Sequence, residues 1–302
     1  MYEKVSKYHI DKVADRIAGA MVDLAYKNSK DEPKVAVEVL IGHKHCHIIA
    51  ESSYDFNEKE VEDIVHRIAG EQFKIDLQVV PQDIFLANNQ RGKMRTGDNG
   101  IFRGVRLSWE EKELSRMARY INGEIIEADG KYLIDNDKIT ICQSGIDTEV
   151  LTKLICEYFK NDDYNFVINP LGNWLNDLDN DTGVTGRKIG SDLGRGATGG
   201  AICGKDLTKS DVSINIFLHL LLNKKNTLLA LCPDDLQGEL ASLCSYLYVD
   251  RRDYLETTCS IGDDIIYIDG FGIEFEHIVK IVKRYIDVAV GGFEKLAEWG
   301  LV

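Results

Sequence analysis

The sequence predicts an α+β protein in which helices and strands form layers. Helical and strand-like hydrophobic periods alternate along the whole chain, but without the regular strand–helix–strand spacing of a doubly wound sheet. The chain is 44% hydrophobic and 28% charged and has only four prolines, which is typical of a globular chain with a packed core. Its 302 residues allow one large domain or two to three small ones.

The first third of the sequence combines clear helical and strand patterns. Val13, Ile17 and Met21 recur at helical spacing, and Asn57 followed three residues later by a glutamate is a helix-start signal. Valine-rich and alternating segments indicate strands. This part therefore predicts a helix over 11–27, a strand over 34–41 continued by an extended stretch over 47–51, a helix over 58–70 and a strand over 73–80.

The rest of the chain continues the same mixture. The middle segment predicts a helix near 109–121, a strand near 132–142, a helix near 148–160 and a short strand over 166–168. Beyond a glycine-rich stretch, Thr208 is placed to cap a long helix, with Asp211 three residues on. There follow a predicted strand over 226–232, a helix over 234–248, strands within 252–268, a helix over 274–289 and a short last helix. No internal repeat is visible, and the predicted domains are 1–104, 105–173 and 174–302.

Charge and cysteine content restrict the class of protein. The net charge of −14 argues against a nucleic-acid binder and against docking on anionic lipid, but a few clustered cations can still bind an anionic small molecule. Seven scattered cysteines without a CxxC pattern indicate reduced thiols. The N-terminal residues lack the apolar stretch of a signal peptide, and the apolar segment 216–222 is too short to span a bilayer. We expect a soluble cytoplasmic protein that contacts neither nucleic acid nor membrane.

Residues 183–204 hold eight of the chain's 26 glycines. Glycine lets backbone amides approach an anion, so this stretch predicts a phosphate nest, and the alternative is a flexible surface loop with solvated charges. Residues 194–199 match GxGxxG, but no convincing strand and helix flank them. Residues 199–205 resemble a Walker A loop, but Asp206 stands where Ser or Thr should hold magnesium. Five cations lie in or beside the stretch, namely Arg187, Lys188, Arg195, Lys205 and Lys209.

Two further patterns carry histidines. His43, His45 and His47 alternate along a predicted strand, which would place three imidazoles on one face. A metal site is one interpretation and a solvated strand face is the favoured one, because no fourth ligand is evident. His9, Asp11 and Asp15 open the first helix, where carboxylates are favoured by the helix dipole.

Together these segments resemble the S-adenosylmethionine synthetases (methionine adenosyltransferases), of which the chain looks like a short, divergent member. HIDKVAD (9–15) is similar to the family's HPDKIADQ, and Glu38 and Glu51 match the spacing of two family glutamates. Further similar segments occur in family order: NQ (89–90), GDNG (97–100), DGK (129–131), FVINPLG (166–172), DTGVTGRK (181–188), GGAICGKDLTKSD (199–211) and GFEKLAEWG (292–300). Asn173-Trp174 stands where the family has Arg-Phe, whose aromatic ring stacks on adenine.

The resemblance implies three related α+β domains with interlocked segments. It also implies a homodimer or a tetramer, with active sites between subunits. The implied reaction joins ATP to L-methionine: the sulfur displaces tripolyphosphate at ribose C5′, and the tripolyphosphate is then hydrolysed. The implied cofactors are Mg²⁺ and K⁺. The main demand is positioning, together with stabilisation of a highly charged leaving group.

The resemblance also implies a role for individual residues. The implied catalytic residues are His9, Lys131, Arg187 and Lys205. The implied ATP-binding set adds Asp129, Trp174, Asp181, Lys188 and Ala201. The implied methionine-binding set is Glu51, Gln90, Asp181 and Lys209, with Gln90 at the start of a lid over 90–98. Magnesium is implied at Glu3, Asp11 and Asp211, and potassium at Glu38.

Two functions stay open from the sequence. One is an active minimal synthetase. The other is a catalytically weak or inactive relative that acts as an ATP- or methionine-binding regulatory module. Retention of His9, Asp11 and Lys205 favours the enzyme, because a binding module has little use for leaving-group cations together with metal carboxylates.

Overall fold

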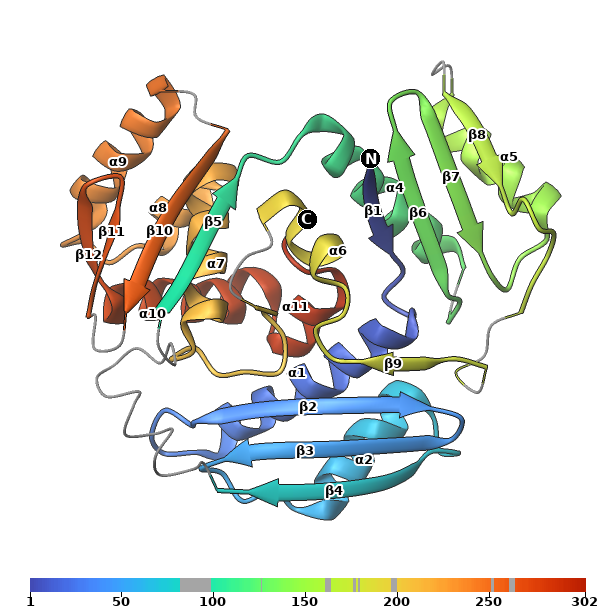
Figure 1. Ribbon diagram of the computed structural model, residues 1–302, viewed down its shortest axis with the longest axis horizontal. Coiled ribbons are helices and arrows are strands. Elements are labelled where there is room, and N and C mark those ends of the chain that lie inside the picture. Colours follow the sequence, from blue (N-terminus) through green and yellow to red (C-terminus); the bar gives the residue numbers. More distant parts are fainter. Residues whose placement is uncertain are drawn as a thin grey trace.

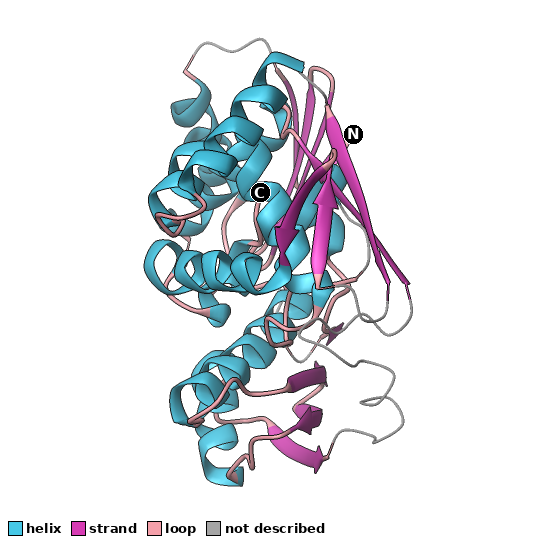
Figure 2. Cartoon of the chain, turned by 90° about the vertical axis from the view of Figure 1, so that its left-hand side faces the viewer, coloured by secondary structure: helices cyan, strands magenta, loops and turns pink. Residues whose placement is uncertain are grey.

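The computed structural model describes residues 1–81, 99–125, 127–160, 164–175, 178, 180–196, 200–250, 253–260 and 264–302. Within these residues the chain is a mixed α/β protein with two four-stranded sheets and two two-stranded ladders. Figure 2 shows the helices gathered mainly on one side of the strands, so that none of the described helices covers the opposite faces of the sheets, which are here called their open faces. Glutamine 90 and the predicted lid over 90–98 lie outside the described residues.

The first sheet has the strand order β4-β3-β2-β9, in which β2 and β3 form an antiparallel hairpin and β4 runs parallel to β3. Alternate residues of β2 are buried against α1 (Ile10–Asn28). Asn57 caps α2 (Glu58–Ala69) as predicted, accepting a hydrogen bond from the amide of Lys59 at 2.9 Å. The strands are β2 (Val35–Gly42), β3 (His45–Ser52), β4 (Lys74–Val80) and β9 (Thr182–Val184).

The second sheet repeats this pattern with different residues. Its strand order is β1-β6-β7-β8. The hairpin β6–β7 is followed in the chain by a helix and by β8, which runs parallel to β7. The outer antiparallel strand, β1, comes from the start of the chain. The two helices associated with it supply a separate hydrophobic core. The elements are β1 (Tyr2–Val5), α4 (Trp109–Glu124), β6 (Gly130–Asp135), β7 (Lys138–Gln143), α5 (Thr148–Phe159) and β8 (Asn165–Ile168).

The remaining elements include two antiparallel ladders (Figure 1). One ladder pairs β5 (Asn99–Val105) with β10 (Tyr254–Ser260), and the other pairs β11 (Ile265–Ile268) with β12 (Phe271–Glu274). The helices are α6 (Ile189–Leu193), the 3₁₀ turn η1 (Gly194–Gly196), α7 (Ser210–Asn223), α8 (Lys225–Leu231), α9 (Gln237–Asp250), α10 (Phe275–Arg284), its π-helical extension η2 (Tyr285–Val290) and α11 (Phe293–Trp299). Figure 1 shows α7, α8, α9 and α10 beside the ladders, and α6 and α11 nearer the centre of the molecule.

Strand pairing joins distant parts of the chain. The N-terminal strand β1 pairs with β6, β2 pairs with β9, and β5 pairs with β10. The ranges 1–104, 105–173 and 174–302 therefore exchange strands with one another, and their use as domain boundaries stays a prediction.

Several local predictions are wrong. The strand predicted over 226–232 is wrong, because these residues belong to the helix α8 and its C-cap Cys232. Leu228 and Leu231 are buried three residues apart, and a short apolar run does not distinguish a strand from a buried helix. The strand predicted over 132–142 is two strands, β6 and β7, joined at Asn136, which has a positive φ of 54°. Thr208 does not cap α7, since its hydroxyl donates to Asp206 and the helix begins two residues later.

The histidine pattern also folds differently from the prediction of three imidazoles on one face. His43 and Lys44 form the two-residue turn of the β2–β3 hairpin, with φ of 49° and 63°, as a type I′ turn requires. His45 and His47 share an exposed face of β3, with ring centroids 6.1 Å apart. His47 lies 3.1 Å from a carboxylate oxygen of Asp76. In the single chain both rings are exposed to solvent, which agrees with the favoured interpretation.

A buried charge network connects α1 to α6. The ammonium of Lys12 donates to Asp15 at 3.0 Å and to both oxygens of Asp192 at 2.6 and 2.8 Å, and all three side chains are at least nine-tenths buried. The two carboxylates raise the pKa of Lys12 against the opposing effect of burial. The network therefore holds a fully charged ammonium between two helices.

Removing this ammonium should destabilise the fold. We expect Lys12→Met to lower the free energy of unfolding by about 3–5 kcal/mol, because two buried carboxylates would lose their counter-charge. Urea denaturation followed by circular dichroism measures this. Lys280→Met, which removes an exposed lysine from an ion pair with the partly exposed Glu276, is the control and should stay within about 0.5 kcal/mol. A loss below about 1 kcal/mol in Lys12→Met would contradict the role given to Lys12.

Candidate active site

The N-terminus of α1 is held against β9. His9 is the N-cap residue, and its Nδ1 accepts a hydrogen bond from the amide of Asp11 at 3.2 Å. The Asp11 carboxylate, only 3% exposed, accepts from the amide of Val184 at 2.9 Å. Gly183 is required at the contact, because a Cβ there would lie 2.4 Å from the backbone of Ile10. The helix start and the beginning of the glycine-rich stretch are therefore one rigid unit.

Two cationic side chains and the imidazole of His9 surround Asp11. The nearest atoms of His9, Lys188 and Arg187 lie 3.8, 3.3 and 3.6 Å from its carboxylate oxygens. Lys131, on β6, forms an ion pair of 2.9 Å with Glu3 on the neighbouring strand β1. Arg187 and Lys131 are about half exposed, so their charged groups can reach a ligand from solvent.

The pKa of His9 shows which groups share its surroundings. Burial lowers this pKa; Asp129 and Asp11 oppose the shift, and Lys188 and Lys131 add to it. His9 is therefore a neutral imidazole near pH 7, set among charged groups from α1, β6 and the residues after β9. We call this group the His9 cluster; it consists of Glu3, His9, Asp11, Asp129, Lys131, Arg187 and Lys188.

Both ends of the glycine-rich stretch pair with the same strand, β2. At one end, Val184 lies opposite Leu40 and the amide of Thr185 donates to Val39. At the other, the amide of Val37 donates to Gly204, and Lys205 lies opposite Ala36. Residues 185–204 therefore leave β2 and return to it two residues away, which closes the stretch into a loop with Arg187 and Lys188 near one end and Lys205 at the other.

The returning end builds a second group of charges, the Lys205 cluster, which consists of Glu51, Lys205 and Asp211. Lys205 donates to the Asp211 carboxylate at 2.6 Å. Glu51 lies opposite Ala36 on the other side of β2, which places it on the same row as Lys205. A Cβ at Gly200 would lie 2.8 Å from an Asp211 oxygen, so the chain passes closely over this carboxylate. Lys209 is the N-cap residue of α7, next to the cluster.

The structure gathers some predicted site residues and separates others. Ala201 lies against Gly186, and Glu38 accepts a hydrogen bond from Thr185 at the closure of the loop. Ala36 and Leu40 are four residues apart along β2, so the strand rows that lead to the two clusters are about 13 Å apart. Asp181 lies beside Gly42, about 20 Å along β2 from the row of Glu51. One chain therefore does not bring these two predicted methionine residues together.

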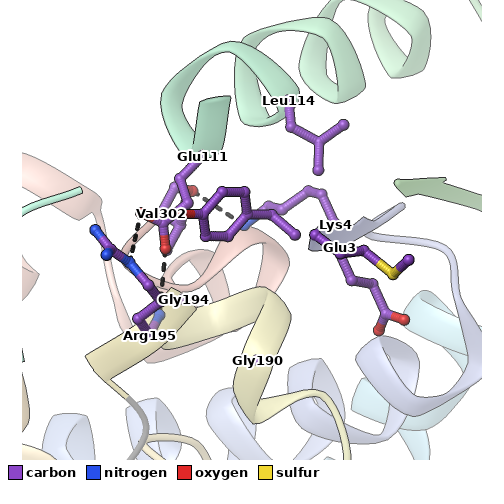
Figure 3. A pocket seen from close by; sticks show the side chains of 10 residues that line it. Glu3, Lys4, Glu111, Leu114, Gly190, Gly194, Arg195 and Val302 are labelled. Atoms are coloured by element: carbon purple, nitrogen blue, oxygen red, sulfur yellow. Dashed lines mark hydrogen bonds and ion pairs between the residues drawn. The ribbon is translucent and has the colours of Figure 1, made fainter. Parts of the chain in front are cut away.

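A pocket of about 340 Å³ is lined in part by the glycine-rich loop and lies between β1, α4 and α6 (Figure 3). In its wall, the Lys4 ammonium donates to the carbonyls of Ser191, Trp299 and Val302 at 2.8, 2.5 and 3.0 Å. The buried Glu111 carboxylate accepts from the amide of Arg195 at 3.2 Å. These contacts hold α6 against β1 and η1 against α4.

Sequence reasoning missed the support of the site. Asp192 and Cys203 were not singled out, yet their ligand atoms and one of Asp15 lie within 4.8 Å of one another, a spacing that could hold a metal ion. The Lys12 ammonium already lies among the two carboxylates, which makes this a structural centre. Asp15 also accepts from the amide of Gly186 at 2.8 Å, just before Arg187. The available signal for Asp192 was that it is the single acidic residue between Asp181 and Asp206, in a stretch rich in glycine and basic residues.

Curated proteins similar to this chain share one name. "S-adenosylmethionine synthase" of Mesoplasma florum is 30% identical, with 70% of each chain covered. That of Novosphingobium aromaticivorans is 27% identical, covering 87% of this chain and 82% of its own. The chain belongs to the S-adenosylmethionine synthase family. This confirms the resemblance seen in the motifs. No family model matches the chain.

A solved structure supports the same fold. The "unusual S-adenosylmethionine synthetase from Campylobacter jejuni" matches with a TM-score of 0.72 at 18% identity, over all of this chain and 95% of that one. The match shows that the fold of a synthase is retained at low identity. Within the described residues, no helix combines the length and apolar character needed to cross a membrane.

The electrostatics of the His9 cluster can be tested by titration. We expect the pKa of His9 to lie below the ordinary value of about 6.5, to rise in Lys188→Met and to fall further in Asp129→Asn. Because the unfolded chain binds this proton more tightly, the His9 contribution to stability should fall as the pH drops from about 6.5 through the folded pKa. NMR of ¹⁵N-labelled imidazoles measures the pKa. Lys295→Met is the control, and a His9 pKa above 6.5 would disprove this picture.

Proposed function

We propose that this chain synthesises S-adenosylmethionine from ATP and L-methionine and then hydrolyses the tripolyphosphate released. The observation that carries the proposal is the closed glycine-rich loop, which supports cations at both of its ends on β2. Family membership supplies the reaction class. The proposed fold is the three related, interlocked domains of this family.

The reaction needs little acid–base chemistry from the protein. The thioether sulfur of methionine is already a nucleophile, and it forms a bond to ribose C5′ as the C5′–O bond to the triphosphate breaks. The electron pair of that bond moves onto the leaving tripolyphosphate, so the negative charge there grows. Preorganised cations aimed at that oxygen stabilise the transition state. We assign this role to His9, Lys131, Arg187 and Lys205, with Lys188 and Asp129 also binding ATP.

The ion pairs of the site suit a metal–triphosphate ligand. Lys205 is paired with Asp211, Lys131 with Glu3, and Lys188 with Asp11. Triphosphate oxygens would replace these carboxylates as partners of the lysines. The carboxylates, which are the hard oxygen donors that Mg²⁺ prefers, would then hold magnesium. Magnesium supplies charge neutralisation to the triphosphate. Potassium at Glu38 is the further cofactor we propose.

The separation of the methionine residues favours a homodimer. In one chain, Asp181 and Glu51 lie about 20 Å apart along β2, so one methionine cannot contact both. We propose that methionine binds where Glu51, Lys209 and Gln90 of one subunit meet the His9 cluster and Asp181 of another. The open faces of the sheets offer the contact surface, with Leu40 and Ile49 about half exposed on the first sheet.

The decisive test is product formation from ATP and methionine with magnesium. Formation of S-adenosylmethionine that stops when magnesium is chelated is the expected result. Binding of both substrates without any product would instead indicate the regulatory module that the sequence left open.

A single variant separates transition-state stabilisation from ordinary binding. We expect Lys205→Met to slow the chemical step about 10²–10³-fold, comparable to the loss of one preorganised oxyanion donor, with little change in the Michaelis constant for methionine. Single-turnover kinetics measures the step. Lys280→Met, which breaks an exposed ion pair with Glu276, should leave the rate unchanged. A Lys205→Met rate within threefold of the parent would rule out the role proposed.

Assembly can be tested at the open sheet face. We expect light scattering to give twice the 34.0 kDa chain mass, and Ile49→Asp to shift the protein toward one chain mass with loss of synthesis. A buried carboxylate in an apolar interface is costly, which is the reason for the shift. Val288→Asp, 75% exposed on η2, is the control. Full activity of a monomer at assay concentration would refute the shared site.

A further inference from the structure

The loop that follows β8 carries Trp174 and is held by polar contacts. Asn169, with a left-handed φ of 40°, turns the chain after β8, and its side chain accepts from the amide of Gln143 at 2.8 Å. Leu171 and Leu175 are 101% and 84% exposed. Apolar packing of these leucines therefore does not hold the loop, and its position depends on hydrogen bonds.

Asn173 makes three of those hydrogen bonds. Its Oδ1 accepts from the amide and the hydroxyl of Thr148 at 2.8 and 2.6 Å, and its Nδ2 donates to Asp147 at 2.9 Å. Asp147 is the N-cap residue of α5, and Thr148 is the first residue of that helix. Asn173 thus accepts hydrogen bonds from donors at the start of α5, where the backbone N–H groups have no partner within the helix. The helix fixes the position of these donors.

Trp174 is placed by its neighbour and by its own backbone. The carbonyl of Trp174 accepts from the amide of Gly145 at 3.3 Å. Its half-buried ring lines an open hollow of about 580 Å³ together with Gly145, Ile146 and Asp147. Polar contacts at residues 173 and 174 therefore hold this ring beside the 145–148 segment.

The same segment leads to the His9 cluster. The amide and hydroxyl of Ser144 donate to the carbonyl of Asp129 at 2.9 and 3.0 Å, and Asp129 shifts the pKa of His9. Hydrogen bonds from the 144–145 segment thus reach both the loop of Trp174 and Asp129, a member of the His9 cluster. The hollow and the His9 cluster share this support, which suits a ligand with a flat base at one end and phosphates at the other.

We propose that Asn173 is a positioning residue that orients Trp174 for stacking on the adenine of ATP, an inference that rests on the proposed function. Asparagine stands here in place of the arginine expected from the motif, and its contacts run to Asp147 and Thr148 of the protein itself. Its task is to order the aromatic ring before the base arrives. A preordered ring lowers the entropic cost of binding.

The test compares a step that needs adenine with one that does not. We expect Asn173→Ala to raise the Michaelis constant for ATP about five- to tenfold and to change the turnover number less than threefold. Hydrolysis of added tripolyphosphate, which contains no base, should stay within twofold of the parent. Thr148→Val, which removes one of the two donors to Asn173, should cause a smaller rise in the same constant.

A second readout follows the ring itself. We expect ATP to quench the fluorescence of Trp174 in the parent, an assignment checked with Trp174→Phe, and the midpoint of this quenching to shift about five- to tenfold in Asn173→Ala. Asn165→Ala removes an exposed asparagine at the other end of β8, which donates to Asp137, and should change nothing.

The outcomes separate the two proposals. Unchanged ATP dependence in Asn173→Ala, or a parallel loss of tripolyphosphate hydrolysis, overturns the positioning role while synthesis by the parent stands. A parent that binds ATP without forming product overturns the proposed function, and the quenching midpoints still decide the role of Asn173. A parent that binds no ATP overturns both.

Discussion

One ammonium group, that of Lys12, joins the two elements on which the candidate site depends. It lies between Asp15 on its own helix and Asp192 on α6, 180 residues away in sequence. Without it, two buried carboxylates would face each other across the junction of α1 and the glycine-rich loop. Asp15 also accepts a hydrogen bond from the amide of Gly186. The Lys12 ammonium therefore helps to fix the turn that places Arg187 and Lys188 next to Asp11.

The proposed site shows how a strongly acidic chain could accept an anion. The net charge of −14 is spread over the molecule, whereas Arg187, Lys188 and Lys205 lie at the two ends of one loop and Lys131 lies on β6. Each of three lysines has a carboxylate partner in the structure. This pairing lowers the free-energy cost of keeping the charges partly buried. If a metal–triphosphate binds as proposed, each lysine would contact phosphate oxygens and each carboxylate would contact the metal.

The architecture contains a repetition that the residues do not display. In both four-stranded sheets a hairpin, a helix and a parallel strand follow in order, and an outer antiparallel strand arrives from elsewhere in the chain. The sequence showed no repeat, because a shared topology needs only the same alternation of apolar residues. The outer strands β1 and β9 bring Glu3 and Val184 to the site.

The sequence by itself determined the local and chemical character of the protein. Amphipathic spacing predicted α1, Asn57 predicted the start of α2, and the motifs around His9, Arg187 and Lys205 were enough to identify the family. These signals are local: each depends on a few neighbouring residues, so a linear reading detects them. The short run 226–232 was misread because its apolar residues suit either a strand or a buried helix.

Only the tertiary structure decided how these parts combine. It closes the glycine-rich stretch on β2, pairs Lys12 with Asp192, and sets Asp181 apart from Glu51. It also ties Asn173 to the start of α5 and so places the ring of Trp174. Each of these features depends on contacts between residues that are distant in sequence. Such contacts form only when strands pair and buried charged groups form ion pairs. Local periodicity contains no record of them.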